Sequence, residues 1–276
     1  MKVLALVQAR MGSARLPNKV MREVGGIPLI ELLLTRLSQS KTINQIVVAT
    51  SIDAKNLPLV NHVSSLGYQS FQGSEQDVLE RFYFAAQQFV GDIIIRITGD
   101  CPLIDPQLVD EAIQKFQESG VDYLCNANPP TFPDGLDIEV FSFSSLERAY
   151  YEANAPSDRE HVTPYIRESG HFSTVNVASE ADFSNLRWTV DEDQDLEVVR
   201  FVVEHFAPNR LFSWKDVLQM YESHSAELTR NSAIVRNEGA SMGTGQKLWK
   251  RAKAVIPGGN MLLSKRAEMF LPDQWP

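Results

Sequence analysis

Residues 3–19 read VLALVQARMGSARLPNK and join a short apolar run to a long polar loop. The run Val3–Val7 contains no polar residue, which is typical of a strand buried on both faces of a sheet. The loop that follows it therefore lies at the carboxyl end of a buried strand. Doubly wound α/β folds bind their ligands at this edge of the sheet, so the loop is the first candidate for a functional site.

The rest of the first half repeats the pattern of a short strand followed by a helix. Further strands are expected at residues 46–50, 68–72, 92–98 and 121–125. Helices are expected from Pro28, from Pro58, over 75–89, and from Asp105 to about Gly120. Strands separated by helices of this length predict a parallel sheet with helices on both faces.

The second half is less regular. Strands are expected at residues 136–143, 171–177 and 186–190. Helices are expected over 144–152, from Ser157, over 195–206 and over 214–223.

Composition and charge exclude several classes of protein. The 276 residues are 43% hydrophobic and 22% charged, which is ordinary for a soluble globular protein. The chain carries 26 Lys and Arg against 35 Asp and Glu, a net charge of −9, which argues against binding to nucleic acid. Two cysteines, Cys101 and Cys125, are too few for a disulfide framework or a cysteine-rich metal site. No apolar run approaches the ~18 residues needed to cross a bilayer, so we expect a cytoplasmic protein with no membrane partner.

The loop over residues 8–19 has the composition of a phosphate-binding site. Gly12 and its small neighbours allow backbone amides to approach an anion closely, and Arg10, Arg15 and Lys19 add three cations. The alternative is an exposed basic loop without a ligand, but the position after the first strand favours phosphate binding. The loop is neither a Walker loop nor a G-x-G-x-x-G element, which disfavours ATPase and dinucleotide-binding functions.

Two acidic segments are candidates for binding a divalent cation. Asp100 follows the strand predicted at 92–98, and a lone carboxylate there suits Mg²⁺, which takes one or two carboxylates plus phosphate oxygens. A helix cap or a turn is the alternative role for Asp100. The segment 191–195, DEDQD, follows the strand predicted at 186–190. One of its acids is the candidate for a second metal ligand, and the others are expected to cap the next helix.

The second half offers candidate groups for binding sugar hydroxyls. On a strand, Asp137 and Glu139 share one face, and Asp134 and Asn126 lie nearby in the sequence. A turn followed by an edge strand explains the same acids without a ligand. His161 lies close to an arginine in the segment SDREHVTPYIRE and is a candidate for contacting an acidic substrate, against the alternative of a helix-surface histidine.

Six segments in order resemble the sugar cytidylyltransferases of the spore-coat-polysaccharide type, which is similar to the synthetases of CMP-3-deoxy-octulosonate and CMP-acylneuraminate. They are QARMGSARLPNK from residue 8, FQGSEQDVLERF from 71, ITGDCPLIDP from 97, FPDGLDIEVFS from 132, SDREHVTPYIRE from 157 and LRWTVDEDQDLEVVR from 186. The resemblance covers about residues 1–225. That family usually has Gly where this chain has Asn18, and Asn tolerates left-handed backbone, so we expect little consequence.

The resemblance implies a fold of class α/β, a three-layer α/β/α nucleotidyltransferase fold with a mostly parallel sheet and a β-rich arm from the second half. It implies transfer of CMP from CTP to an acidic sugar of the ulosonic-acid type, with release of pyrophosphate, for surface polysaccharide biosynthesis. It also implies Mg²⁺ as cofactor. A homodimer is expected because relatives of this type are often dimers.

The resemblance also assigns roles to individual residues. Asp100 and Asp191 match the two metal-binding aspartates, and Arg15, Lys19 and Asp100 are expected to act in catalysis. The residues expected to bind the nucleotide are Gln8, Arg10, Gly12, Ser13, Arg15, Lys19, Ser74 and Asp77. Those expected to bind the sugar are Asn126, Asp134, Asp137, Glu139 and His161. Two alternatives stay open: another nucleoside triphosphate as donor, and a non-catalytic nucleotide-binding domain that regulates a fused aminotransferase.

The character of the chain changes after about residue 231. The segment 237–245, NEGASMGTG, has the composition of a linker. Residues 248–259, LWKRAKAVIPGG, resemble the opening of the glutamate-1-semialdehyde type of aminotransferase, a pyridoxal-phosphate family. We therefore expect a cytidylyltransferase domain over 1–232, then a linker and the truncated start of a second domain over 233–276. Because so short a segment cannot form its own core, we expect residues 233–276 to be dispensable for CMP transfer.

Overall fold

The computed structural model describes residues 1–13 and 15–236. The chain divides into two units, Met1–Ser232 and Ala233–Pro276, and the fold is that of the first. The predicted linker and the aminotransferase-like segment fall within 237–276 and lie outside the described residues. Over the described ranges, none of the helices is both long and apolar enough to span a membrane.

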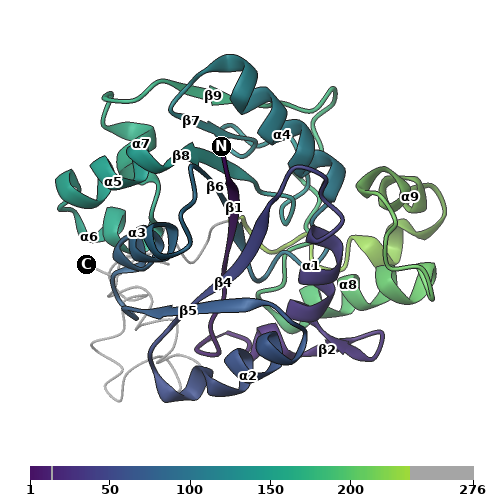
Figure 1. Ribbon diagram of the computed structural model, residues 1–276. Helices are drawn as coiled ribbons and strands as arrows, with labels where there is room; N and C mark the ends of the chain where they lie inside the picture. Colours follow the sequence, from purple (N-terminus) through teal and green to yellow (C-terminus); the bar gives the residue numbers. More distant parts are fainter. Residues whose placement is uncertain (14, 237–276) are drawn as a thin grey trace, which may run out of the picture. The chain divides into compact units, whose positions relative to one another are not determined.

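A seven-stranded sheet in the order β5-β4-β1-β6-β8-β7-β9 runs through the first unit (Figure 1). Its strands are β1 (Val3–Gln8), β4 (Gln45–Ser51), β5 (Gln69–Gly73), β6 (Ile93–Thr98), β7 (Tyr123–Cys125), β8 (Glu139–Ser142) and β9 (Thr174–Asn176). The neighbours β5, β4, β1 and β6 are parallel, and so are β7 and β9. Strand β8 runs antiparallel to both β6 and β7. Over the described residues, the second half contributes only the short strands β8 and β9, which extend the central sheet, so the separate β-rich arm expected from it does not form.

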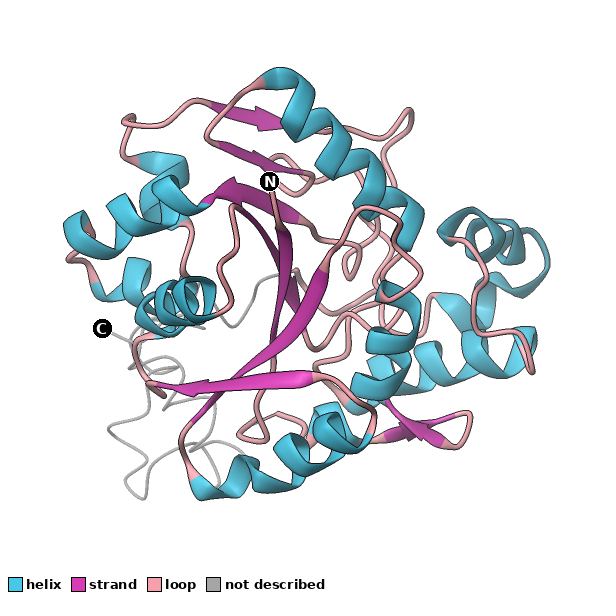
Figure 2. Ribbon diagram, in the orientation of Figure 1, coloured by secondary structure: helices cyan, strands magenta, loops and turns pink. Residues whose placement is uncertain are grey.

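Helices cover both faces of the sheet, so the fold has three layers (Figure 2). They are α1 (Leu29–Leu37), α2 (Leu57–Ser65), α3 (Val78–Gln88), α4 (Pro106–Ser119), α5 (Phe143–Glu152), α6 (Pro156–His161), α7 (Pro164–Glu168), α8 (Asp193–Phe206) and α9 (Trp214–Leu228). Val3, Ala5 and Val7 of β1 lie in one hydrophobic core with α1, α2, α4, α8 and α9. Leu4 and Leu6 point to the opposite face and lie in a second core with α3 and α5.

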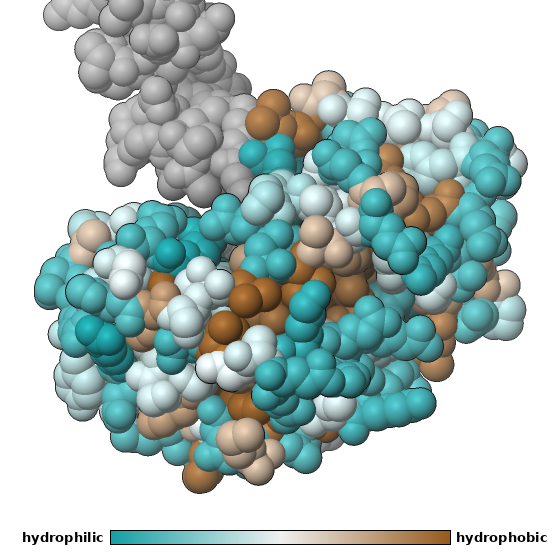
Figure 3. All heavy atoms as spheres, turned by 90° about the horizontal axis from the view of Figure 1, so that it is seen from above, coloured by the Kyte–Doolittle hydropathy of each residue, from teal (hydrophilic) through white to brown (hydrophobic). Residues whose placement is uncertain are grey.

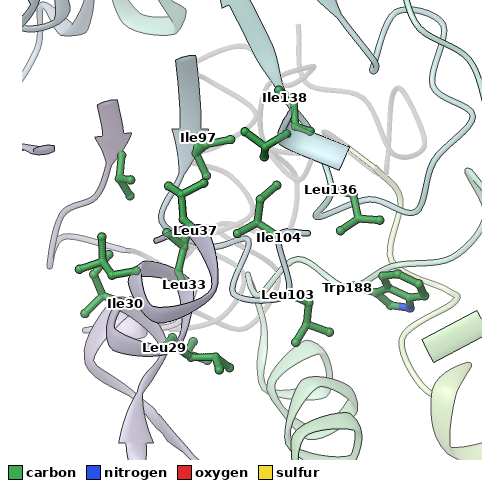
Figure 4. Packing of buried hydrophobic residues seen from close by; sticks show 14 of the residues in the cluster. Leu29, Ile30, Leu33, Leu37, Ile97, Leu103, Ile104, Leu136, Ile138 and Trp188 are labelled. Atoms are coloured by element: carbon green, nitrogen blue, oxygen red, sulfur yellow. The ribbon is translucent and has the colours of Figure 1, made fainter. Parts of the chain in front are cut away.

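The first core extends to the loops at the carboxyl edge of the sheet. Figure 4 shows Ile97, at the end of β6, clustered with Ile104, Leu136 and Trp188 from three of these loops. The Trp188 side chain is fully buried, and its indole nitrogen donates to the hydroxyl of Tyr221 at 3.1 Å. The loops that carry the candidate acidic residues therefore pack on one common core. The surface seen in Figure 3 is mainly hydrophilic, with hydrophobic residues showing in patches.

Residues 186–190 do not form the strand predicted for them. The backbone amides of Trp188 and Thr189 donate to the carbonyl oxygen of Asp134 at 2.6 and 2.9 Å, so this segment bonds to a loop and not to a strand. Gly135 permits the close approach, because its φ is 109° and a Cβ there would lie 2.5 Å from the amide nitrogen of Thr189. The apolar pattern indicated burial correctly, but burial does not decide which backbone groups pair.

Candidate functional site

The loop that follows β1 is fixed by hydrogen bonds at both of its ends. The amide of Met11 donates to the side-chain oxygen of Asn56 at 2.8 Å, and Asn56 is fully buried. Asn18 has a φ of 58°, and its amide donates to the carbonyl oxygen of Met11 at 3.3 Å. Asn18 thus adopts the left-handed backbone that asparagine tolerates, at the position where the similar family usually has glycine.

Gly12 and Ser13 lie in the middle of this loop. The hydroxyl oxygen of Ser13 accepts the amide of Leu16 at 3.3 Å, which closes a local turn. A Cβ on Gly12 would lie 3.8 Å from the ammonium nitrogen of Lys55, a residue of the short 3₁₀ helix η2 (Ala54–Asn56) after β4. Lys55 is thus a further cation beside the loop. Lys55 was not predicted from the sequence, although it follows a strand at the same edge of the sheet.

The three predicted cations of the loop separate in the structure. A guanidinium nitrogen of Arg15 lies 2.9 Å from Asp191, and the ammonium nitrogen of Lys19 lies 2.8 Å from the same carboxylate oxygen. Arg10 points away from them, and its guanidinium lies 2.6 Å from Glu75. Two of the cations therefore lie beside a predicted metal ligand, and the third lies toward the segment after β5.

Asp100 and Asp191 lie on two sides of the ammonium group of Lys19. The nitrogen is 2.7 Å from Oδ2 of Asp100 and 2.8 Å from Oδ1 of Asp191. The backbone holds the two segments together, because the amide of Val190 and the hydroxyl of Thr189 both donate to the carbonyl oxygen of Asp100, at 2.8 and 3.2 Å. The structure thus joins the two aspartates that the resemblance assigns to a metal. Their role as ligands stays a prediction.

Electrostatic interactions keep Lys19 and Asp100 charged. Burial alone would lower the pKa of Lys19, whose side chain is 14% exposed, but the charges of Asp100 and Asp191 raise it above its ordinary value. Burial alone would raise the pKa of Asp100, but the adjacent ammonium lowers it to about 2. Asp100 is therefore ionised at neutral pH, as a metal ligand must be.

Of the acids in residues 191–195, the geometry favours Asp191 as a metal ligand. Asp195 is fully buried and accepts two backbone amides at the start of α8, at 2.9 and 3.0 Å, while the side chain of Asp193 is 78% exposed. Only oxygens of Asp100 and Asp191 converge on Lys19 in the part of the chain that the structure describes. Such a hard oxygen pair fits Mg²⁺, which takes its other ligands from phosphates and water. Over the described ranges, no group of three or more His, Cys, Asp and Glu suits a metal by itself.

The predicted nucleotide-binding residues Ser74 and Asp77 make local contacts. The hydroxyl oxygen of Ser74 accepts the amide of Asp77 at 3.0 Å, and Asp77 caps α3 by accepting the amide of Glu80 at 2.8 Å. The other oxygen of Asp77 pairs with the guanidinium of Arg159 at 2.5 Å. Two of the six segments, those from residues 71 and 157, therefore meet at this ion pair.

Two of the predicted sugar-binding residues are buried and bonded within the protein. Asn126 is 2% exposed, and its side chain donates to the carbonyl oxygen of Leu136 and accepts the amide of Ile138, both at 2.8 Å. Asp134 is 8% exposed and pairs with Arg187 at 2.6 Å. These contacts fix the shape of the segment between β7 and β8, a role that the sequence pattern did not reveal.

Glu139 belongs to a different network, on β8. Its carboxylate accepts the hydroxyls of Tyr123 and Thr163 at 2.6 and 2.5 Å and pairs with Arg96. Arg96 also donates to the side-chain oxygen of Gln8 at 3.0 and 3.2 Å, so this predicted nucleotide-binding residue joins the same network. Burial alone would raise the pKa of Glu139, but Arg96 and the two hydroxyls lower it below its ordinary value.

The remaining two predicted sugar-binding residues lie in a loop and at the end of a helix. Asp137 precedes β8 by two residues and is half-buried. His161 is the last residue of α6 and is also half-buried. The five predicted sugar-binding residues are therefore distributed over several local arrangements, and their role in binding stays a prediction.

Comparisons with known proteins bear on this geometry. A family model described as Cytidylyltransferase matches residues 4–232. The spore coat polysaccharide biosynthesis protein SpsF of Bacillus subtilis is 34% identical over 211 residues, which cover 72% of this chain and 85% of that protein. The 3-deoxy-manno-octulosonate cytidylyltransferase of Chloroherpeton thalassium is 31% identical over 121 residues, 43% of this chain and 48% of that protein. The solved structure of a cytidylyltransferase from Leptospira borgpetersenii matches with a TM-score of 0.81 and 33% identity, covering 86% of this chain and 100% of that chain. The predicted α/β fold with a mostly parallel sheet is thereby confirmed.

Proposed function

The chain belongs to the cytidylyltransferase family, and from this we propose that it transfers CMP from CTP to a hydroxyl group of an acidic sugar and releases pyrophosphate. The observation that carries the proposal is the convergence of Asp100 and Asp191 on Lys19, beside a loop that also supplies Arg15. The sugar class rests on relatives, one of them a 3-deoxy-manno-octulosonate cytidylyltransferase. The similarity to a spore coat polysaccharide biosynthesis protein supports a role in building a surface polysaccharide.

The reaction forms one P–O bond and breaks another. The sugar hydroxyl oxygen attacks the α-phosphorus of CTP and gives up its proton to solvent water. The bond from that phosphorus to the oxygen that bridges to the β-phosphate breaks, and pyrophosphate leaves with the bonding electrons. Because no protein side chain forms a covalent bond in this reaction, the protein accelerates it by positioning the reactants and by neutralising charge on the phosphates.

To Arg15 and Lys19 we assign the neutralisation of charge on the departing pyrophosphate. Both contact Asp191, at 2.9 and 2.8 Å, and the side chain of Arg15 is 34% exposed, so it can turn toward a phosphate bound at the loop. Guanidinium and ammonium groups aimed at developing negative charge are among the largest contributors to such catalysis. The backbone amide of Gly12 is the further donor that we assign to the phosphates, because the amides of Met11 and Ser13 donate to Asn56 and to the carbonyl oxygen of Met11.

We assign Mg²⁺ to Asp100 and Asp191. A bound Mg²⁺ would draw charge from the phosphate oxygens of CTP. The two carboxylates supply hard oxygen donors, and their contact with one shared ammonium group supports their serving one cation.

Pyrophosphate release tests the proposal. The full chain is incubated with Mg²⁺, CTP and either 3-deoxy-octulosonate or an acylneuraminate, with ATP, GTP and UTP in parallel. We expect release only with CTP and an acidic sugar, and a CMP-sugar of the corresponding mass. Release from another nucleotide alone would overturn the choice of CTP, and release only with a neutral sugar would overturn the sugar class. Binding of CTP without turnover of any sugar would favour the regulatory alternative.

A further inference from the structure

Arg187 lies among three carboxylates next to the candidate metal site. Its guanidinium nitrogens are 2.6 Å from Asp134, 3.0 Å from Asp191, and 2.9 and 3.1 Å from the two oxygens of Asp195. The Arg187 side chain is 5% exposed. A buried guanidinium with this many charge-assisted hydrogen bonds has one available orientation.

The two oxygens of Asp191 have different partners. Oδ2 accepts from the guanidinium of Arg187 at 3.0 Å. Oδ1 faces Lys19 at 2.8 Å and Arg15 at 2.9 Å, on the side where Asp100 lies. Arg187 therefore fixes the rotation of the Asp191 carboxylate, with one oxygen held inside the protein and the other presented to the cation site.

Asp195 and Asn231 hold Arg187 in place on the side away from Asp191. Asp195 is fully buried and pairs with it through both oxygens. The side-chain nitrogen of Asn231, 1% exposed, donates to Asp195 at 2.8 Å and to the carbonyl oxygen of Arg187 at 2.9 Å. These contacts leave the guanidinium little freedom to follow Asp191 if that side chain turns. The orientation of the Asp191 carboxylate is therefore set by the fold.

We propose that Arg187 is a positioning residue for the transfer reaction, which orients Asp191 toward the divalent cation and ties that carboxylate to the 134–138 segment through Asp134. The inference rests on the proposed function, because it concerns how the same site is assembled. Groups that orient a ligand from behind typically contribute about 10–100-fold to metal affinity. A lysine keeps the charge but has no planar fork, so it cannot hold three carboxylates in this arrangement.

The test compares two buried arginines. Arg187→Lys removes the fork beside Asp191. Arg36→Lys is the matched control, because Arg36 is 1% exposed and donates to four carbonyl oxygens, those of Ile104, Arg210, Leu103 and Phe212. Binding of Mn²⁺ to each full chain is followed by electron paramagnetic resonance with the α,β-methylene analogue of CTP present. Thermal unfolding of each variant measures loss of stability separately.

We expect Arg187→Lys to weaken Mn²⁺ binding about 10–100-fold and to raise the Mg²⁺ concentration for half-maximal pyrophosphate release, with much of kcat recovered at high Mg²⁺. Arg36→Lys should lower stability and leave both metal readouts unchanged. Equal Mn²⁺ affinity in Arg187→Lys and in the unchanged protein overturns the proposal. Absence of Mn²⁺ binding by the unchanged protein also overturns the proposal.

Asp195→Asn covers the case in which Arg187→Lys does not fold. This change weakens the contact between residue 195 and the Arg187 guanidinium at nearly constant side-chain volume, so it should also weaken Mn²⁺ binding. Unchanged Mn²⁺ binding by this variant would then overturn the proposal. The proposed function can fail separately. If metal binding responds to Arg187→Lys but no acidic sugar is converted, the reaction is wrong and the positioning role stands.

Discussion

The ammonium nitrogen of Lys19 lies 2.7 Å from Oδ2 of Asp100, and this contact places a protein cation where the divalent cation is expected. The same nitrogen is 2.8 Å from Asp191, so the ammonium group of Lys19 partly neutralises the charge of both candidate ligands. A divalent cation that enters must displace the ammonium group or share the carboxylates with it. The phosphates of CTP offer Lys19 new partners, so metal and nucleotide are expected to bind together.

Replacing Lys19 by Met should raise the affinity of the nucleotide-free protein for Mn²⁺ at least about tenfold. Two unit charges 4 Å apart repel by about 4 kcal/mol at an effective dielectric constant of 20, and about 1.4 kcal/mol is enough for a tenfold change. Turnover with CTP should fall, because the same ammonium is assigned to the leaving group. Titration with Mn²⁺ in the absence of nucleotide measures the first effect. Lys115→Met, an exposed position on α4, is the control, and weaker Mn²⁺ binding by Lys19→Met would contradict the competition.

Replacing Asp100 by Asn should keep the fold and lower turnover at least ~10²-fold, as removal of a main electrostatic group does. The change removes one charge at nearly constant volume from the pair that shares Lys19. Steady-state pyrophosphate release with Mg²⁺ is the measurement. Asp193→Asn is a matched control at a side chain that is 78% exposed and should have little effect. Near-normal turnover of Asp100→Asn would remove Asp100 from the metal site.

Much of this fold was predictable because its strands are short apolar runs. β1, β4 and β6 lie within a residue or two of the predicted ranges, since strands buried on both faces are mainly apolar. The edge strand β5 also lies within a residue of its predicted range, although it is mostly polar and none of its residues is fully buried. The segment 186–190 was mispredicted because its amides bond to loop carbonyls that are distant in sequence. Local pattern shows that a segment is buried and does not show what it pairs with.

The candidate site was predictable to the extent that it follows strand ends. Asp100 and Lys19 each follow a strand of the parallel sheet, and strand ends of one direction meet at one edge. The partners of Asn126 and Glu139 come from segments that the sequence does not show to be adjacent. Arg187 was missed, although acids four and eight residues after it were a signal for ion pairing near a helix start.

Replacing Arg36 by Met should lower the free energy of unfolding by about 2–4 kcal/mol, because buried carbonyl oxygens lose their donor. Arg36 is 1% exposed, donates to four such oxygens and lies 4.4 Å from the ring centre of Phe212. Burial lowers its pKa to about 10, which leaves it charged at neutral pH. Urea unfolding gives the value. Arg148→Met, at an exposed i,i+4 ion pair with Glu152, should lower the free energy of unfolding by less than about 1 kcal/mol. Equal losses in the two variants would show that the four buried hydrogen bonds of Arg36 do not stabilise the fold.

Replacing Asp110 by Asn should destabilise the protein in a pH-dependent way. Burial alone would raise the pKa of Asp110, but hydrogen bonds from the Lys41 amide and the hydroxyls of Ser40 and Thr42 lower it. A carboxyl whose pKa is lower in the folded state stabilises above its unfolded pKa of about 3.9 and loses that contribution as pH falls through the folded pKa. The difference in unfolding free energy between the unchanged protein and Asp110→Asn should be constant from pH 6 to 8 and shrink below about pH 4. A difference that does not change with pH would show that the charge of Asp110 contributes nothing.

Ending the chain at Ser232 should preserve both stability and pyrophosphate release, whereas ending it at Arg230 should lower the stability and raise the Mg²⁺ concentration that release requires. The longer chain keeps Asn231, which is 1% exposed and donates to Asp195 and to the carbonyl oxygen of Arg187. The shorter chain leaves those two buried acceptors without that donor, at a cost of about 1–3 kcal/mol, and it releases Asp195 and Arg187 on the side away from Asp191. We therefore expect the chain that ends at Arg230 to unfold at lower urea concentration and to need more Mg²⁺, and Asn231→Ala in the full chain to reproduce both effects. Loss of folding or of activity in the chain that ends at Ser232 would show instead that residues 233–276 belong to the catalytic domain, and the expected domain boundary would be wrong.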